Sequence, residues 1–257
     1  MIHAAGLAHI FDNSSADMTS FPSVNENGTA NVISASAEAG VGHFILISSV
    51  SVYGPFAQVE LDENYPCNPV GPYALSKYNA EQRAKVIAKK SGMALTILRL
   101  ATLYGEGDPG NVGRLMRAMD KRRFIWIGDG RNRKSLLHKG DAARACLSVA
   151  MHPASGINIY NVSAPPCSMR DIVSGLSRAL GRKPLPGRIP SSVALGLTRF
   201  ISRISDNRLN QFHQTLQKWL SEDVYDTRRF EEAYSFQTKS SLEDGLKREV
   251  DWYRQNQ

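Results

Sequence analysis

The chain has 257 residues, 42% of them hydrophobic and 21% charged, which is the composition of an ordinary globular protein with a sizeable core. Its formal net charge of +7 suits an anionic partner, but the basic residues lie in short groups without a nucleic-acid motif. We therefore expect a phosphorylated small molecule rather than nucleic acid. Cys67, Cys146 and Cys167 lack metal-site or disulfide spacing, and no run approaches the roughly 18 apolar residues of a membrane span. These patterns favour a cytoplasmic protein with reduced thiols, no metal site and no membrane association.

The first elements alternate between strands and helices. IHAAG (2–6) has the pattern of a strand that runs into a turn of small residues. A helix-like stretch, 28–40, precedes the apolar run HFILISS (43–49), and a second, 74–92, precedes the apolar run 94–105. Unbroken apolar strands between amphipathic helices are typical of a parallel sheet covered on both faces. The sequence therefore predicts an α/β fold of this kind.

The second half of the chain changes in texture. A helix at 141–152 precedes a short strand at 156–163, and from Pro165 the sequence is richer in Pro, Ser and Arg. This indicates a smaller, mostly helical part that ends in a helix at 240–255. The amphipathic stretch 192–204 is predicted to be a helix packed on its own domain rather than a membrane anchor.

Two constellations could carry chemistry. SSVSVYG (48–54) places hydroxyl groups at the carboxyl end of a strand, where ligands bind in open α/β folds, although such a segment alone is more often turn chemistry. Tyr73 and Lys77 stand four residues apart at the start of a helix, so they share one face. A neighbouring ammonium favours the phenolate, which makes a proton carrier. A chance surface pair is the alternative, but the order of strand end, helix and strand favours a site.

Landmarks along the whole chain carry a resemblance to a known family. The chain resembles the extended short-chain dehydrogenase/reductase family, the NAD-dependent nucleotide-sugar epimerases and dehydratases, and in particular its UDP-glucose 4-epimerase-like members. This implies a Rossmann-like sheet in a partial NAD-binding domain, 1–164, and a C-terminal substrate-binding lobe, 165–257. Segments around 104–135 of the first range would also belong to the substrate lobe. The segments that carry the resemblance are IHAAG, NENGTANVI, HFILISSVSVYG, PYALSK, LRLATLYGEG, GDGRNRKSLLHKGDAARA and SLEDGLKREVDWY.

The resemblance also implies roles for individual residues. Tyr73 would be the acid/base on the sugar 4-hydroxyl, Lys77 would lower its pKa and hold the nicotinamide ribose, and Ser49 would hydrogen-bond the reacting oxygen. Lys134 stands where the family has an arginine that clamps the nucleotide phosphate. The implied cofactor is NAD, with NADP not excluded, and its implied contacts are Ala4, Ala5, Gly6, Asn25, Ile47, Ser48, Tyr73, Lys77 and Leu100. The implied substrate contacts are Ser49, Thr102, Arg133 and Lys134.

The front of the chain departs from the family pattern. The family's first strand carries a glycine-rich turn, G-x-x-G-x-x-G, that holds the cofactor pyrophosphate, and nothing before Ile2 supplies it. Because IHAAG resembles the family's fourth strand, we expect the first three strands to be missing and the chain to self-associate through an unpaired edge. GEGDPG (105–110) fits a phosphate-binding motif, but its two acids and its proline argue against that function.

Three functions stay open. The first is an NAD-dependent epimerase or dehydratase that acts at the 4-position of a UDP-hexose. The second is an NAD(P)H-dependent ketoreductase with the same residues, and the third is a catalytically silent chain that keeps a sugar-nucleotide surface. The helices around Ile33 and Tyr78, which form the family's usual dimer contact, are present in the sequence, and a homodimer stays open as well.

Overall fold

A parallel four-stranded sheet is the centre of the larger part of the computed structural model, which describes residues 1–8, 20–55, 60–202 and 216–256. Every pair of neighbours in this sheet is parallel, and the apolar runs read from the sequence form the central strands. The strands, in the order in which they lie in the sheet, are β1 (Ile2–His3), β2 (His43–Ser49), β3 (Ala94–Leu100) and β8 (Ile157–Val162).

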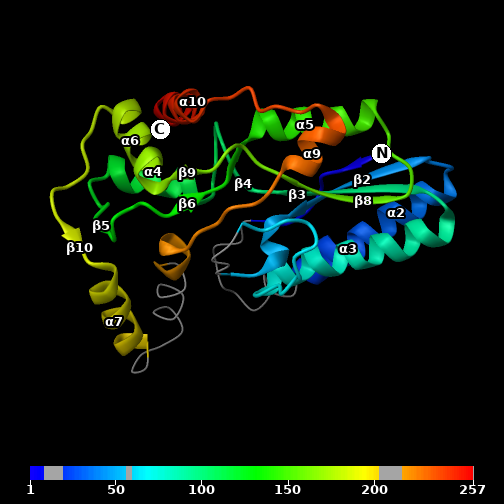
Figure 1. The fold of residues 1–257 in the computed structure, drawn as a ribbon, viewed down its shortest axis with the longest axis horizontal. Helices are drawn as coiled ribbons and strands as arrows, with labels where there is room; N and C mark the ends of the chain where they lie inside the picture. Colours follow the sequence, from blue (N-terminus) through cyan, green and yellow to red (C-terminus); the bar gives the residue numbers. More distant parts are fainter. Residues whose placement is uncertain (9–19, 56–59, 203–215, 257) are drawn as a thin grey trace.

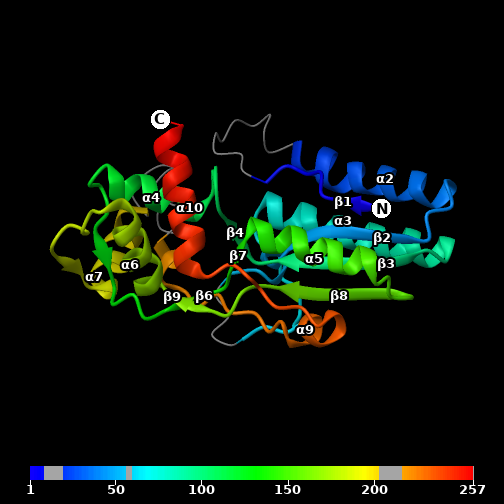
Figure 2. The same cartoon turned by 90° about the horizontal axis from the view of Figure 1, so that it is seen from above.

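Helices cover both faces of this sheet, as Figures 1 and 2 show. On one face of the sheet, Ile33 and Ala84 pack against Phe44 and Leu95. On the other face, Ala145 packs against strand residues whose side chains point to that side. Both faces of β2 and β3 are therefore buried, which explains their unbroken apolar sequences. The predicted doubly covered α/β sheet is confirmed. The covering helices are α2 (Gly28–Glu38), which continues η1 (Pro22–Asn27), α3 (Pro72–Ser91), α5 (Lys139–Met151) and α9 (Arg228–Tyr234).

A smaller lobe packs beside the carboxyl ends of the strands. Its core joins α4, α6 and α10 through Leu115, Leu176 and Leu246, and a capping box of Ser168 and Asp171 starts α6. The residues after 165 do not all belong to the lobe, because α9 returns to the sheet and buries Phe230 there. The elements of the lobe are α4 (Asn111–Asp120), β5 (Trp126–Ile127), β6 (Arg133–Lys134), β9 (Cys167–Ser168), α6 (Met169–Leu180), β10 (Arg188–Ile189), α7 (Ser191–Ser202) and α10 (Leu242–Gln255).

Two predicted elements differ from the structure. The apolar run 94–105 reads as one strand, but it breaks at Ala101 into β3 and β4 (Thr102–Tyr104). The break arises because β3 pairs with β8 whereas β4 pairs with β7 (Leu136–His138) in a separate sheet. The predicted helix 192–204 corresponds to α7, and its last two residues lie outside the described part of the chain.

An extended segment, 223–226, connects the lobe with the sheet domain. At its first residue, the Asp223 amide donates to the Arg133 carbonyl (3.0 Å), and its carbonyl accepts from the Ser135 amide (2.7 Å). At its other end, the ring of Tyr225 stacks on Tyr53 with centroids 5.9 Å apart. Leu61 also pairs with this segment, through Val224 and Asp226. We call residues 223–226 the connector.

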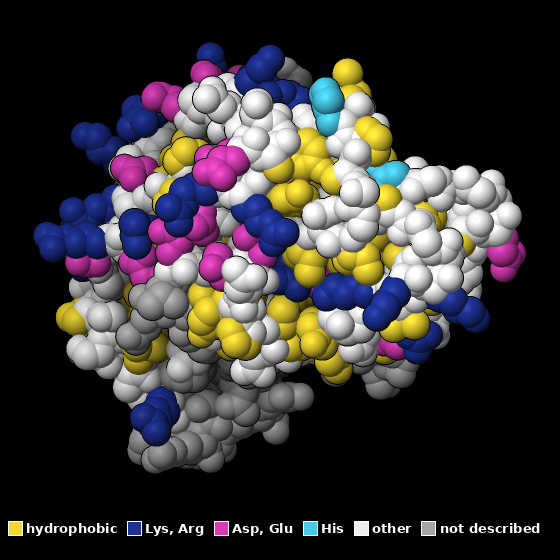
Figure 3. All heavy atoms as spheres, turned by 45° about the vertical axis from the view of Figure 1, so that its right-hand side comes forward, with side chains coloured by type: hydrophobic (Ala, Val, Ile, Leu, Met, Phe, Trp, Pro, Cys, Tyr) yellow, Lys and Arg dark blue, Asp and Glu magenta, His cyan; other side chains and the backbone are white. Residues whose placement is uncertain are grey.

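The surface shows no single dominant charge on the face in Figure 3. There, Lys and Arg side chains lie among acidic and hydrophobic ones, which agrees with the short basic groups of the sequence. All three cysteines lie in the described residues and are free thiols. Within the described ranges, the helices are too short or too polar to cross a bilayer.

Candidate active site

Ser49 ends β2 and starts a short helical turn, η2 (Val50–Tyr53). Its backbone is extended, and its hydroxyl accepts a hydrogen bond from the Ser51 amide at 3.2 Å. The serine thus caps the turn in the usual way of serine at a helix start. This local chemistry fixes the Ser49 hydroxyl at the carboxyl end of the sheet.

Tyr73 lies at the start of α3, directly after Pro72 at the first helical position. The side chain of Ser49 lies close enough to the Tyr73 hydroxyl to act on its pKa. Burial raises the pKa of Tyr73, and the neighbouring Ser49 side chain opposes that rise. The structure therefore brings together two of the three predicted catalytic side chains, although their catalytic roles remain predictions.

Lys77 follows one turn later on α3, and only 9% of the residue is exposed. Its Nζ donates to the Ile47 carbonyl at 2.5 Å. Burial lowers the pKa of Lys77 to about 8, and the carboxylate of Glu81 acts in the opposite direction. This hydrogen bond holds the lysine against β2, the strand that ends at Ser49.

The turn of small residues after β1 faces the same lysine. A Cβ added at Gly6 would lie 3.0 Å from the Asn25 Oδ1 and 3.9 Å from the Lys77 Nζ, so only glycine fits there without displacing the asparagine. Buried Asn25 holds this turn by accepting from the Leu7 amide (2.7 Å) and donating to the Leu7 carbonyl (2.9 Å). It also donates to Ser76 on α3 (3.0 Å).

These residues fit the nicotinamide end of a dinucleotide. A ribose offers hydroxyl groups to an ammonium, and a backbone without side chains lets a flat ring approach closely. Lys77 and Gly6 supply both features within one small region. Ala4 and Ala5 precede Gly6 on the same exposed turn.

The structure locates three further predicted contacts of the cofactor or the substrate: Ser48, Leu100 and Thr102. The Ser48 hydroxyl points to Glu81 and donates to its Oε1 at 2.6 Å, so its side chain is used inside the protein. Leu100 is buried at the end of β3, and Thr102 is half-buried in β4. Their contacts with a cofactor or a substrate stay predictions.

Lys134, a predicted contact of the substrate phosphate, is hydrogen-bonded to the connector. Lys134 is 8% exposed, and its Nζ donates to the Asp223 carboxylate (2.6 Å) and to the Lys218 carbonyl (2.7 Å). Arg133 is exposed and pairs with Glu222 at 3.1 Å. Because the Lys134 ammonium is already satisfied, Arg133 is the more available of the two for a phosphate.

In the alternative phosphate motif, 105–110, the Asp108 side chain occupies backbone amides that a phosphate would bind. The Asp108 carboxylate accepts from the Gly110 amide (2.7 Å) and from the Gly113 amide (2.9 Å) at the start of α4. A phosphate would need these amides and would face that negative charge. The loop thus uses its own carboxylate at the start of α4.

A buried ion pair supports the site, and the sequence analysis missed it. Glu81, with no exposed surface, accepts from the Arg99 Nε (3.1 Å) and Nη2 (2.7 Å). The Arg99 guanidinium also lies 4.8 Å from the ring centroid of Tyr53, whose hydroxyl donates to Asn161. Two signals could have revealed the pair: Glu81 is one turn beyond Lys77, and Arg99 is a lone charge in an apolar strand.

The fold and the arrangement around β2 and α3 define the class: a Rossmann-type α/β protein of the extended short-chain dehydrogenase/reductase group. More particularly, the chain belongs to the NAD-dependent epimerase/dehydratase family, whose model matches residues 1–163. This confirms the family predicted from the sequence.

Two relatives of similar sequence are named as 4-epimerases. Over 163 residues, covering 62% of this chain and 49% of the relative, the chain is 33% identical to N-acetyl-alpha-D-glucosaminyl-diphospho-ditrans,octacis-undecaprenol 4-epimerase of Escherichia coli O157:H7. It is 31% identical to UDP-glucose 4-epimerase of Vibrio cholerae over 63% of this chain and 51% of that enzyme. The matches thus span about half the length of these two enzymes. The fold matches UDP-glucuronic acid 4-epimerase from Bacillus cereus in complex with NAD, with a TM-score of 0.78 and 20% identity over 99% of this chain and 74% of that one.

Proposed function

We propose that this chain carries the catalytic residues of an NAD-dependent 4-epimerase for a UDP-hexose. The observation that supports the proposal most is that Ser49 lies beside Tyr73, while Lys77, one turn further along α3, lies beside the turn at Gly6. Oxidation at a carbinol carbon needs a base for the hydroxyl proton and a hydride acceptor. The base is available within this group of side chains.

Each residue has a role in this proposal. Tyr73 takes the proton of the sugar 4-hydroxyl and later returns it, while Ser49 hydrogen-bonds the same oxygen and keeps it in reach of the phenol. The Lys77 ammonium favours the phenolate and holds the ribose beside the turn at Gly6. When bound, NAD supplies the acceptor and donor of hydride.

One feature favours an epimerase over a dehydratase. Eliminating water from the sugar needs an acid that protonates the departing hydroxyl group in addition to the tyrosine. The segment that follows β2, SSVSVYGPFAQV (48–59), contains no Asp or Glu. The carboxylate of buried Glu81 accepts hydrogen bonds from Ser48 and Arg99. Proton transfer by Tyr73 alone is sufficient for epimerisation.

The test is conversion of UDP-glucose to UDP-galactose by the purified chain with added NAD, followed by chromatography. We expect Tyr73→Phe to lower kcat by about 10²-fold to 10⁴-fold, since it removes the proton carrier. Tyr65→Phe is the matched control, because Tyr65 is 40% exposed and should leave the rate unchanged. Calorimetric titration of NAD into both variants checks that cofactor binding is kept.

The alternatives predict different results. A ketoreductase would oxidise NADH or NADPH with a ketone substrate and leave the sugar nucleotide unchanged. A 4-keto-6-deoxy product would identify a dehydratase. A folded chain that binds no NAD would be catalytically silent, and the epimerase proposal would then be wrong for this chain.

We also propose a cytoplasmic homodimer that uses the outer faces of α2 and α3. The apolar side chains of Leu75 and Val86 on α3 are 49% and 68% exposed, which supports an apolar contact there. Ile33, in contrast, is fully buried against the sheet. It positions α2 for such a contact and does not take part in it.

A further inference from the structure

A cavity of about 420 Å³ lies in the lobe. Its walls come from β5, from α6, from β10 and from the segment between α6 and β10. None of these elements carries Ser49, Tyr73 or Lys77, and both ribbon views place the lobe elements beyond the end of the sheet. The cavity is therefore distinct from the candidate active site.

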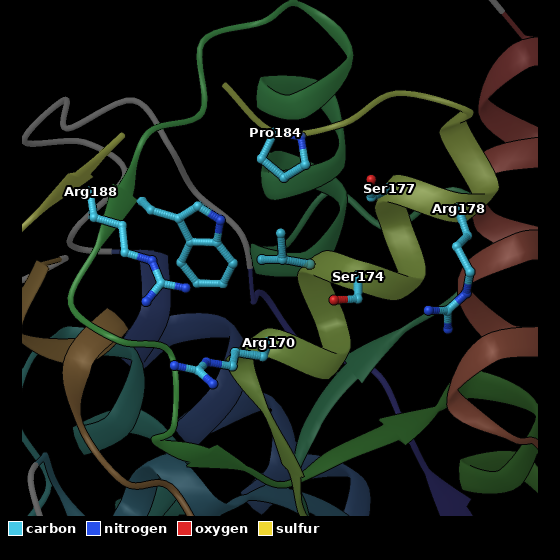
Figure 4. Close-up of a pocket in the computed structure, with 8 residues that line it drawn as sticks. Arg170, Ser174, Ser177, Arg178, Pro184 and Arg188 are labelled. Atoms are coloured by element: carbon cyan, nitrogen blue, oxygen red, sulfur yellow. The ribbon is translucent and has the colours of Figure 1, made fainter. Parts of the chain in front are cut away.

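The lining of this cavity is rich in cations. It contains Arg170, Arg178 and Arg188, together with the hydroxyl groups of Ser174 and Ser177, and no Asp or Glu. In Figure 4, Arg170, Ser174 and Arg188 face the space between α6 and β10. Arg178 extends to the other side of α6, where it pairs with Glu243 at 3.2 Å. Two arginines thus supply the positive charge of the cavity.

These two guanidinium groups are held in place without being neutralised. The Arg170 Nε donates to the Asp129 carbonyl at 2.6 Å, which fixes the side chain and leaves its terminal nitrogens available. The Arg188 guanidinium lies 5.6 Å from the ring centroid of Trp126. Among the described residues, neither arginine forms an ion pair with a carboxylate.

Three acidic side chains of the lobe, Asp129, Asp171 and Glu243, interact with other groups. The Asp129 carboxylate, which also attracts Arg170, accepts from the Arg131 amide at 3.0 Å and lies 3.5 Å from the Arg131 Nε. Asp171 caps α6 by accepting from Ser168, and Glu243 is paired with Arg178. The potential in the cavity is therefore set by Arg170 and Arg188.

We propose that this cavity binds a phosphate-bearing ligand between Arg170 and Arg188. The planar guanidinium forks match phosphate oxygens, and a serine hydroxyl on α6 can donate to the same group. The indole of Trp126 offers an apolar wall to the part of the ligand that follows the phosphate. A soluble sugar or nucleoside phosphate and the headgroup of an anionic lipid share this chemistry.

The test is a calorimetric titration of inorganic pyrophosphate into the full chain at low ionic strength. We expect Arg188→Gln to weaken one binding event at least 10-fold. Lys183→Gln is the matched control, because Lys183 is an exposed cation near the cavity that does not line it, and it should leave the affinity unchanged. Thermal unfolding of both variants checks the fold. Equal effects of the two substitutions, or none, would overturn the proposal.

A second arm identifies the source of the phosphate. Co-sedimentation with phosphatidylglycerol vesicles that is lost in Arg188→Gln and competed by pyrophosphate would identify a lipid headgroup. Pyrophosphate binding without vesicle binding would identify a soluble phosphate ligand. The epimerase proposal is tested separately, since Tyr73→Phe should leave the Arg188-dependent binding unchanged and Arg188→Gln should leave NAD binding unchanged.

Discussion

Lys77 is buried as a cation, and its protonation is linked to folding. Its pKa is lowered to about 8 by burial, against 10.5 for an exposed lysine. Between these two values the unfolded chain binds a proton that the folded chain does not, so stability rises with pH in this window. Below pH 8 both states are protonated, and the folded state carries the full cost of the buried charge.

We therefore expect the free energy of unfolding to rise between pH 8 and 9.5 by about 2 kcal/mol more in the wild type than in Lys77→Met, at roughly 1.4 kcal/mol per pH unit. Urea unfolding at pH 8 and 9.5 in the absence of NAD measures the difference. Lys183→Met, which removes an exposed lysine, is the control. Equal pH slopes for the wild type and Lys77→Met would show that the ammonium is solvated.

The site residues could be predicted from sequence to the extent that their signals are local. Ser49 ends an apolar run, and Tyr73 and Lys77 share one turn of a helix, so each of the three residues has a signal in its own segment. The ion pairs around the site are not local in sequence. Glu81 on α3 pairs with Arg99 on β3. Lys134 pairs with Asp223, which lies 89 residues further along the chain. The burial of Lys134 therefore could not be predicted.

At the scale of elements, the Glu81–Arg99 pair ties α3 to β3. Both side chains are almost fully buried, and the carboxylate also accepts from Ser48 on β2. Removing one partner of a buried pair leaves an uncompensated charge, which costs more than the pair contributes. The pair thus holds the helix of Tyr73 and Lys77 in register with the sheet.

We expect Glu81→Gln to lower the free energy of unfolding by about 3 to 5 kcal/mol. Glu26→Gln is the control, because Glu26 pairs with Arg83, whose side chain is 48% exposed, and loss of such a pair costs at most about 1 kcal/mol. Urea unfolding at neutral pH compares the two variants. Similar losses for both would show that water reaches Glu81.

The fold itself was predictable where a strand is buried on both faces. The bounds of β2 follow from the run HFILISS, and α3 ends just before Gly92, whose φ is +73°. The division of the run 94–105 was not predictable, because only the pairing of β4 with β7 separates it from β3. That pairing depends on residues more than thirty positions away.

At the scale of the whole molecule, β1 is an edge strand among the described residues. It pairs only with β2, and its Ile2 is 38% exposed. We expect these 257 residues, expressed alone, to self-associate as concentration rises, because a free strand edge pairs with other chains. Sedimentation velocity measures this, and Ile2→Lys should reduce it.

Ile125→Lys is the control for this effect. Ile125 is 51% exposed and lies next to β5 in the lobe, so the substitution changes charge and apolar surface equally without touching the edge of β1. A chain that stays monomeric at all concentrations would contradict the prediction. So would an equal effect of both substitutions.

The connector makes the two parts of the molecule mechanically dependent. Its Asp223 is fastened to the lobe through Lys134, while its Tyr225 lies on Tyr53 in the turn that follows Ser49. A displacement of the lobe would be passed to η2 through these four residues, because the connector is hydrogen-bonded at Asp223 and packed against Tyr53 at Tyr225. A ligand that tightened the lobe could in this way alter the stiffness of the turn beside the catalytic serine without touching it.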